Sequence, residues 1–199
     1  MAYQDFSIEK VERDFSITIA DAPNLFETIP EREPSPLLRS LLAEFTPLGS
    51  AIGTEKARSE FIIAPILAEV RKLAAHHVSL FSGNRFDVDS AKGLTGYCDF
   101  LLSFSASQIS ISAPVFAVVE AKNDNINAGF GQCMAEMIAA QIYNQEKKKP
   151  IDAIYGCVTT GSIWRFLKLV ESGMSVDSVE YYLDQLPKIL GIFLAALRM

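Results

Sequence analysis

Apolar and polar residues recur along most of the chain with the spacings of amphipathic helices and short strands. Apolar residues at helical spacing predict helices over residues 37–45, 54–76, 125–144 and 183–198. Alternating or continuously apolar runs predict strands over residues 15–19, 97–105, 114–122, 153–159, 162–170 and 176–182, with two short extended pieces in 78–88. Pro65 lies inside the second helix, so we expect a kink or a break there.

The order of these elements predicts an α/β fold in which a mixed central sheet is flanked by helices. We expect antiparallel pairing through the central strands, and the helix over residues 125–144 should connect two parallel strands. Residues 23–36 contain several prolines and acidic residues, which is typical of a loop. We therefore predict an N-terminal arm and linker over residues 1–36 and a single domain over residues 37–199.

The composition restricts the kind of function. The chain has 199 residues, of which 49% are hydrophobic, as expected for one globular domain. The longest clean apolar run, residues 189–197, is far shorter than the ~20 residues of a spanning helix, so no membrane is expected. Residues 1–14 are charged and mixed, without the pattern of a secretory signal. The net charge of −6 excludes nucleic-acid binding by bulk charge alone, so a local basic face or bridging metal ions would be required.

The cysteine and histidine residues give little evidence of a zinc site. The three cysteines, Cys98, Cys133 and Cys157, are far apart and form no CxxC pair, which predicts buried free thiols in a reducing cytoplasm. The two histidines, His76 and His77, are adjacent and so do not share a helix face.

Three charged residues at strand ends form the candidate chemistry. Glu120 and Lys122 follow the apolar run of residues 115–119 and project to the same face of the expected strand. Asp99 lies near the start of the preceding strand, so an antiparallel hairpin would bring its carboxylate beside that of Glu120. Two neighbouring carboxylates repel unless a cation or a proton lies between them, and oxygen ligands suit Mg²⁺ or Mn²⁺. Lys122 could then stabilise developing negative charge or orient a water molecule.

Asp99 followed by the Glu120-Ala121-Lys122 segment resembles the PD-(D/E)xK nuclease superfamily, which has the restriction-endonuclease-like fold. The resemblance implies a core of one helix, three strands, a helix and a strand, which fits residues 54–159. It implies that Asp99 and Glu120 hold Mg²⁺ or Mn²⁺, that the Ala121 carbonyl is a further ligand, and that Lys122 assists the attacking water. The residue before Asp99 is Cys98, where the superfamily motif has proline.

The same resemblance adds two supporting residues to the site. Relatives carry a glutamate on the first core helix, and residues 59–67 resemble that segment with Glu60 as the acid. Relatives also carry a glutamine on the helix after the lysine, here Gln132, which should point toward Lys122. Each has a simpler explanation, since a helix dipole favours Glu60 and Gln132 could be an exposed helical side chain. Glu136 lies one turn further along the face of Gln132 and is a weaker candidate.

The resemblance thus predicts a cytoplasmic Mg²⁺- or Mn²⁺-dependent endonuclease, a hydrolase of phosphodiester bonds acting on nucleic acid, with DNA as the expected substrate. A homodimer would suit cleavage of both strands. The alternative within the same fold is a catalytically silent protein that binds or assembles, which the acidic net charge favours. The third hypothesis is an unrelated α/β binding protein in which the spacing of Glu120 and Lys122 is accidental.

Overall fold

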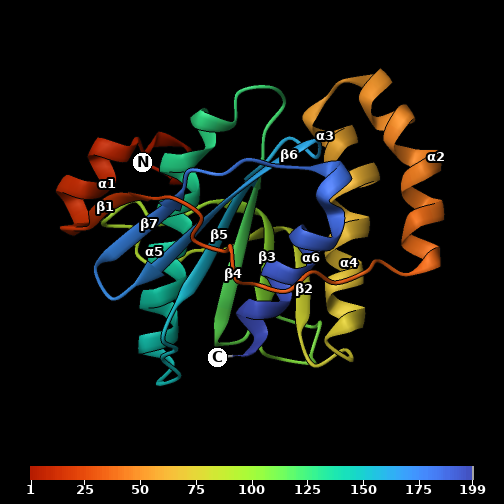
Figure 1. Cartoon of the computed structure of the whole chain (residues 1–199). Helices are drawn as coiled ribbons and strands as arrows, with labels where there is room; N and C mark the ends of the chain where they lie inside the picture. Colours follow the sequence, from red (N-terminus) through yellow and green to blue (C-terminus); the bar gives the residue numbers. More distant parts are fainter. Residues whose placement is uncertain (199) are drawn as a thin grey trace.

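The computed structural model describes residues 1–198, which form a mixed eight-stranded sheet covered by helices on both faces (Figure 1). The strands are β1 (Thr18–Ala22), β2 (Ser79–Arg85), β3 (Tyr97–Ser103), β4 (Val115–Ala121), β5 (Ile154–Thr159), β6 (Ile163–Val170), β7 (Gly173–Asp177) and β8 (Tyr181–Tyr182). The α-helices are α1 (Ile8–Phe15), α2 (Pro36–Ile52), α3 (Glu55–Arg58), α4 (Ala64–Leu73), α5 (Phe130–Glu146) and α6 (Leu186–Ala195). The predicted α/β class with a mixed sheet and flanking helices is confirmed.

The strand order is β1-β7-β6-β5-β4-β3-β2, and β8 pairs with β6. Strands β2, β3 and β4 are antiparallel neighbours, whereas β4 and β5 are parallel and are connected by α5. From α4 to β5 the elements therefore follow the order helix, three strands, helix, strand, as the sequence predicts. All seven residues of β4 and all six residues of β5 are buried, as expected for central strands covered on both faces.

Two hydrophobic clusters cover the two faces of the sheet. One cluster joins the sheet to α2, α4 and α6, with Leu38, Leu67 and Phe193 among its buried side chains. The other joins the opposite face to α5 and to the N-terminal residues, with Met134 and Tyr3 among its members. Figure 1 shows this arrangement, with α5 on one side of the sheet and α4 and α6 on the other. Among residues 1–198, no helix is long and apolar enough to cross a membrane.

The helix predicted over residues 54–76 is divided into three parts. The α3 turn is followed by a π-helical turn, Ser59–Ile63, and then by α4. In the π turn the Ala64 N–H donates to the carbonyl of Ser59, five residues earlier. Pro65 lies in the first turn of α4 and has no N–H to donate to the preceding turn. The local change to wider winding accommodates the proline, so the predicted irregularity is a π turn.

Several element boundaries differ from the sequence predictions. The first strand is β1, Thr18–Ala22, rather than residues 15–19, and α1 precedes it where no helix was predicted. Helix α2 continues to Ile52 through Pro47, beyond the predicted end at residue 45. The extended segment at 78–88 is mainly one strand, β2, in which Gly83 has a positive φ of 64°. Such differences are expected because pairing and packing, rather than local propensity, decide where an element ends.

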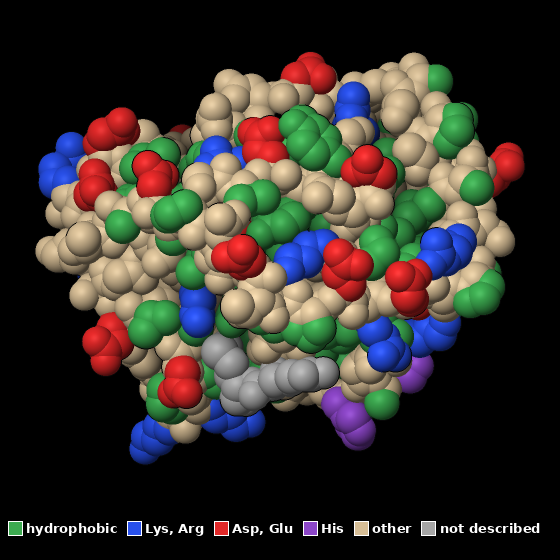
Figure 2. Space-filling view, viewed as in Figure 1, with side chains coloured by type: hydrophobic (Ala, Val, Ile, Leu, Met, Phe, Trp, Pro, Cys, Tyr) green, Lys and Arg blue, Asp and Glu red, His purple; other side chains and the backbone are tan. Residues whose placement is uncertain are grey.

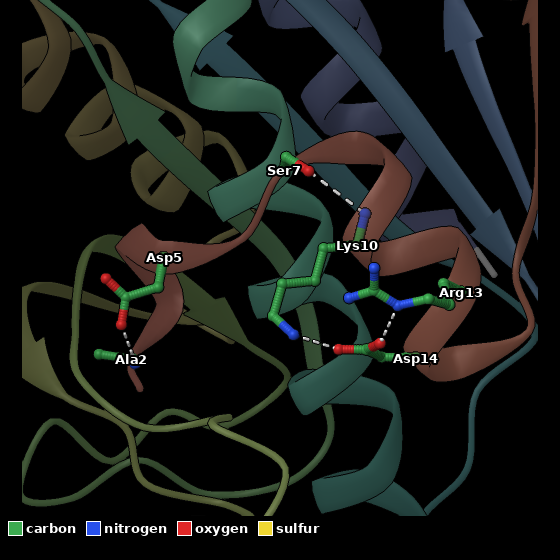
Figure 3. A network of polar contacts seen from close by, with 6 residues as sticks. All are labelled: Ala2, Asp5, Ser7, Lys10, Arg13 and Asp14. Carbon is green, nitrogen blue, oxygen red and sulfur yellow. Dashed lines mark hydrogen bonds and ion pairs between the residues drawn. The ribbon is translucent and has the colours of Figure 1, made fainter.

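The predicted N-terminal arm is packed onto the sheet. Tyr3 is 1% exposed and Val11 is fully buried, and β1 pairs in parallel with β7. Polar contacts hold the surface of the segment together (Figure 3): the Ala2 N–H donates to Asp5, and Asp14 accepts from both Lys10 and Arg13. The three cysteines are buried and free, as predicted.

Candidate active site

The candidate residues meet where β4 ends beside the start of β3. The pairing of β3 with β4 is antiparallel, and its last register pair at this end is Phe100 with Val119. Asp99 and Glu120 are the next residues on the two strands, so they lie across from each other. The predicted placement of the two acids on adjacent antiparallel strands is therefore observed.

Asp99 is fixed against the backbone of β4. Its Oδ2 atom accepts a hydrogen bond of 2.8 Å from the Ala121 N–H. On the other side of β4, the Lys122 N–H donates to the Thr159 carbonyl at 2.8 Å, and Ala121 is paired in register with Thr159. In a parallel ladder with this pattern, the N–H and C=O groups of Ala121 both point away from β5, toward β3. The Ala121 carbonyl is thus directed to the same sheet edge as Asp99.

Glu120 and Lys122 form an ion pair on the face of the sheet covered by α5. Lys122 Nζ donates to Glu120 Oε1 and also to Gln132 Oε1, the latter at 3.4 Å. The predicted direction of Gln132 toward Lys122 is therefore observed. A Cβ atom on Gly129 would lie 3.1 Å from the Lys122 Cγ atom and 2.5 Å from Val158. The absence of a side chain at Gly129 therefore allows the Lys122 side chain to lie close against the start of α5.

One oxygen of Glu120 lacks a partner. The residue is only 1% exposed, and Oε2 is a buried atom with no hydrogen bond among the described residues. Leaving a carboxylate oxygen buried and unsatisfied costs free energy, so a protein retains such a group only where something compensates for it. The unpartnered oxygen lies in a carboxyl group next to that of Asp99, and a proton or a bound cation would compensate for its burial.

The pKa values show how strongly the acids influence one another. Burial, followed by the charge of Asp99, raises the pKa of Glu120 to about 8. Burial also raises the pKa of Asp99, although the Ala121 N–H opposes this effect. For Lys122, burial by itself lowers the pKa, but the negative charge of Glu120 and its hydrogen bond raise it on balance. Lys122 is therefore a cation at neutral pH, held between Glu120 and Gln132.

Glu60 does not join this group, contrary to the expectation from the family pattern. Its carboxylate pairs with Lys56 at 2.9 Å, and its side chain is 55% exposed. The acid of this helical segment whose charge interacts with the site is Glu55. The pKa of Glu55 is raised by burial, lowered by the charge of Lys122 and raised by the charge of Asp99. The first turn of α3, capped by Thr54, therefore carries an acid that the family pattern did not indicate.

A cavity of about 230 Å³ opens beside Asp99. Its walls come from α3, the π turn, β2 and β3, and include Glu55, Glu60, Ser82 and Asp99. Asp99 is thus accessible from this cavity, whereas Glu120 and Lys122 are not among the residues that line it. On the face of the molecule in Figure 2, acidic and basic side chains are interspersed and do not form one basic patch.

Two further observations complete the description of the site. Among residues 1–198, no group of three or more His, Cys, Asp or Glu side chains is arranged as a metal site. The donor set at this strand end is instead two carboxylates with a backbone carbonyl.

The sequence matches no protein-family model, and no curated protein matches it significantly. The geometry of the strand end is therefore the basis for a functional proposal.

Proposed function

We propose that the protein is a divalent-metal-dependent nuclease that hydrolyses phosphodiester bonds, with DNA as the expected substrate. The observation that carries this proposal is the buried, unpartnered Oε2 atom of Glu120 next to Asp99, at a strand end that also presents the Ala121 carbonyl. All three groups are oxygen donors, which Mg²⁺ and Mn²⁺ prefer. A metal ion held there would polarise the phosphate and lower the pKa of a bound water.

Lys122 supplies the second part of the proposed chemistry. Because it is protonated, it acts as a hydrogen-bond donor and a positive charge rather than as a general base. Two of its N–H groups are directed to Glu120 and Gln132, and its side chain is 20% exposed. The remaining N–H can orient the attacking water or stabilise charge on the phosphate oxygens in the transition state.

The resemblance to the PD-(D/E)xK superfamily is part of the same proposal. It is supported by the order of elements from α4 to β5 and by the positions of Asp99, Glu120, Lys122 and Gln132 on them. The net charge of −6 means that a bound metal would have to offset repulsion between the protein and nucleic acid. Buried free thiols support a reducing, cytoplasmic location, and a homodimer would place two such sites on one duplex.

A cleavage assay tests the proposal directly. The purified protein is incubated with supercoiled plasmid, linear duplex DNA, single-stranded DNA and RNA, in Mg²⁺, in Mn²⁺ and in excess chelator. We expect metal-dependent cleavage of at least the DNA substrates, and none with chelator. Metal binding without cleavage of any substrate would favour the catalytically silent alternative, and no metal response at all would contradict the site.

Glu55 and Glu60 form a matched pair for a second test. Both line the cavity beside Asp99, but Glu60 is paired with Lys56, whereas the charges of Lys122 and Asp99 act on the pKa of Glu55. We expect Glu55→Gln to raise the metal concentration needed for half-maximal cleavage by about tenfold, which is the usual scale for residues that support a metal site. Glu60→Gln should leave it unchanged. Metal titrations of cleavage for the two variants measure this, and a larger effect of Glu60→Gln would reverse the assignment.

A further inference from the structure

Glu136 is an acid in the core of the protein that the proposed chemistry does not use. It is fully buried on α5, and the nearby core positions of that helix are occupied by uncharged residues such as Cys133, Met137 and Ala140. Its Oε2 atom is buried without a hydrogen-bond partner among the described residues. A buried carboxyl group is costly, and an apolar residue of similar volume would often be as stable or more stable. The position therefore carries a cost that packing alone does not explain.

A hydrogen bond of this carboxyl group leads to the candidate active site. Gln132 Nε2 donates to Glu136 Oε1 at 3.1 Å, and Gln132 Oε1 accepts from Lys122 Nζ at 3.4 Å. Gln132 and Glu136 are four residues apart and so share one face of α5. The three side chains form a continuous hydrogen-bond relay from the buried face of α5 to Lys122, the residue that follows β4.

The relay depends on the orientation of the Gln132 amide. An amide has an acceptor at one end and donors at the other, and either end could face Lys122. Only the acceptor end is compatible with a lysine ammonium, because donors facing donors repel. A carboxyl group at position 136 accepts from the Nε2 end whether or not it is ionised, and this leaves Oε1 for Lys122.

We infer that Glu136 is a positioning residue that sets the orientation of the Gln132 amide and thereby holds the Lys122 ammonium in the active site. This inference depends on the proposed nuclease function for its catalytic consequence, but the orientation of the amide does not. Glu136 touches no reacting atom in this arrangement and acts through Gln132.

The test uses four variants of the full chain and one control variant. Glu136→Met keeps the side-chain volume and removes the acceptor, whereas Glu136→Gln keeps an acceptor oxygen. Gln132→Met removes the relay itself, and the double variant combines both methionines. Met137→Leu, one residue further along α5 and packed near Gly156, is the matched control for changes in core packing.

We expect Glu136→Met to lower kcat by about tenfold or more with little change in KM, as found for residues that orient the groups at a metal site. Glu136→Gln should recover most of the rate. The Glu136→Met substitution should have no further effect in the Gln132→Met background, because Glu136 acts only through Gln132. Thermal stability should not fall in Glu136→Met, which separates a positioning role from a folding defect.

A measurement without activity keeps this inference separate from the proposed function. The side-chain amide protons of Gln132, assigned in ¹⁵N NMR spectra by their loss in Gln132→Met, should exchange slowly in the wild type and in Glu136→Gln. They should exchange faster in Glu136→Met. If the amide signals and the rate are the same in Glu136→Met as in the wild type, or if the two methionine substitutions add, the inference is wrong. If the wild type does not cleave, the amide signals alone decide it.

Discussion

Lys122→Met is expected to lower the rate of metal-dependent cleavage by at least about 100-fold, which is the scale for losing a positioned catalytic donor. The stabilisation of the protein by Mg²⁺ or Mn²⁺ should persist, because the lysine is not a metal ligand. Methionine keeps most of the side chain that packs beside Gly129 and removes only the ammonium group. Cleavage rates and metal-dependent thermal melts of the same samples measure both effects.

Asp99→Asn should give the opposite pattern in the melts. A metal ion that binds only the folded protein stabilises it by about 2.7 kcal/mol at a concentration of about 100 times the Kd. Removal of the Asp99 carboxylate should abolish most of this gain. It should also relieve repulsion with Glu120 in the metal-free protein.

For the Lys122→Met prediction, the exposed Lys147→Met serves as a control for the loss of a lysine. Cleavage that survives in Lys122→Met would refute the role of the lysine.

The free energy of unfolding of the metal-free protein is expected to fall as the pH rises from about 4.5 to about 8. Burial and the charge of Asp99 raise the pKa of Glu120 from 4.5 to about 8. Between these values the folded protein keeps a proton that the unfolded chain has released, so a rising pH removes stability. Below this interval the contribution of Glu120 is fully present, and above it the contribution is lost. Burial raises the pKa of Asp99 and of Glu136 as well, which acts in the same direction.

Glu120→Gln isolates this contribution. The variant should be more stable than the wild type near pH 8 by a few kcal/mol, since each tenfold change in proton affinity corresponds to about 1.4 kcal/mol. The difference should shrink toward pH 4.5. Chemical denaturation in chelator at several pH values measures it, with the exposed Glu44→Gln on α2 as the control. A difference that is independent of pH would show that Glu120 does not titrate as the structure indicates.

The central part of the fold follows from local patterns in the sequence. The apolar runs that become β3, β4 and β5 are long and uninterrupted, and the segment that becomes α5 is rich in residues that favour helices. A connection through one helix between β4 and β5 makes these strands parallel. The spacing of Glu120 and Lys122 along one strand likewise places both on one face, because successive strand residues alternate between faces.

The identity of the supporting acids could not be obtained in this way. Glu55 and Glu60 belong to the same helical segment, and the partners of each depend on the winding through the π turn and on how the segment packs against the sheet. Glu136 resembles an ordinary polar position on a helix, and only the packing of α5 on β4 and β5 makes it fully buried. Burial is a property of the tertiary structure, so its effects on pKa values and on unpartnered oxygens are also tertiary.

The N-terminal segment also combines a feature that the sequence predicts with features that only the tertiary structure shows. Its prolines and acidic residues predict a loop over residues 23–36, and the backbone is irregular over residues 23–35, but they do not reveal that β1 pairs with β7 or that Tyr3 is buried. By itself the sequence determined the class of fold, the central strands and the pairing of Asp99 with Glu120, because these depend on side-chain periodicity and short connections. The tertiary structure decided the packing of the N-terminus, the choice of Glu55 and the burial of Glu136, because each depends on contacts between residues far apart in the chain.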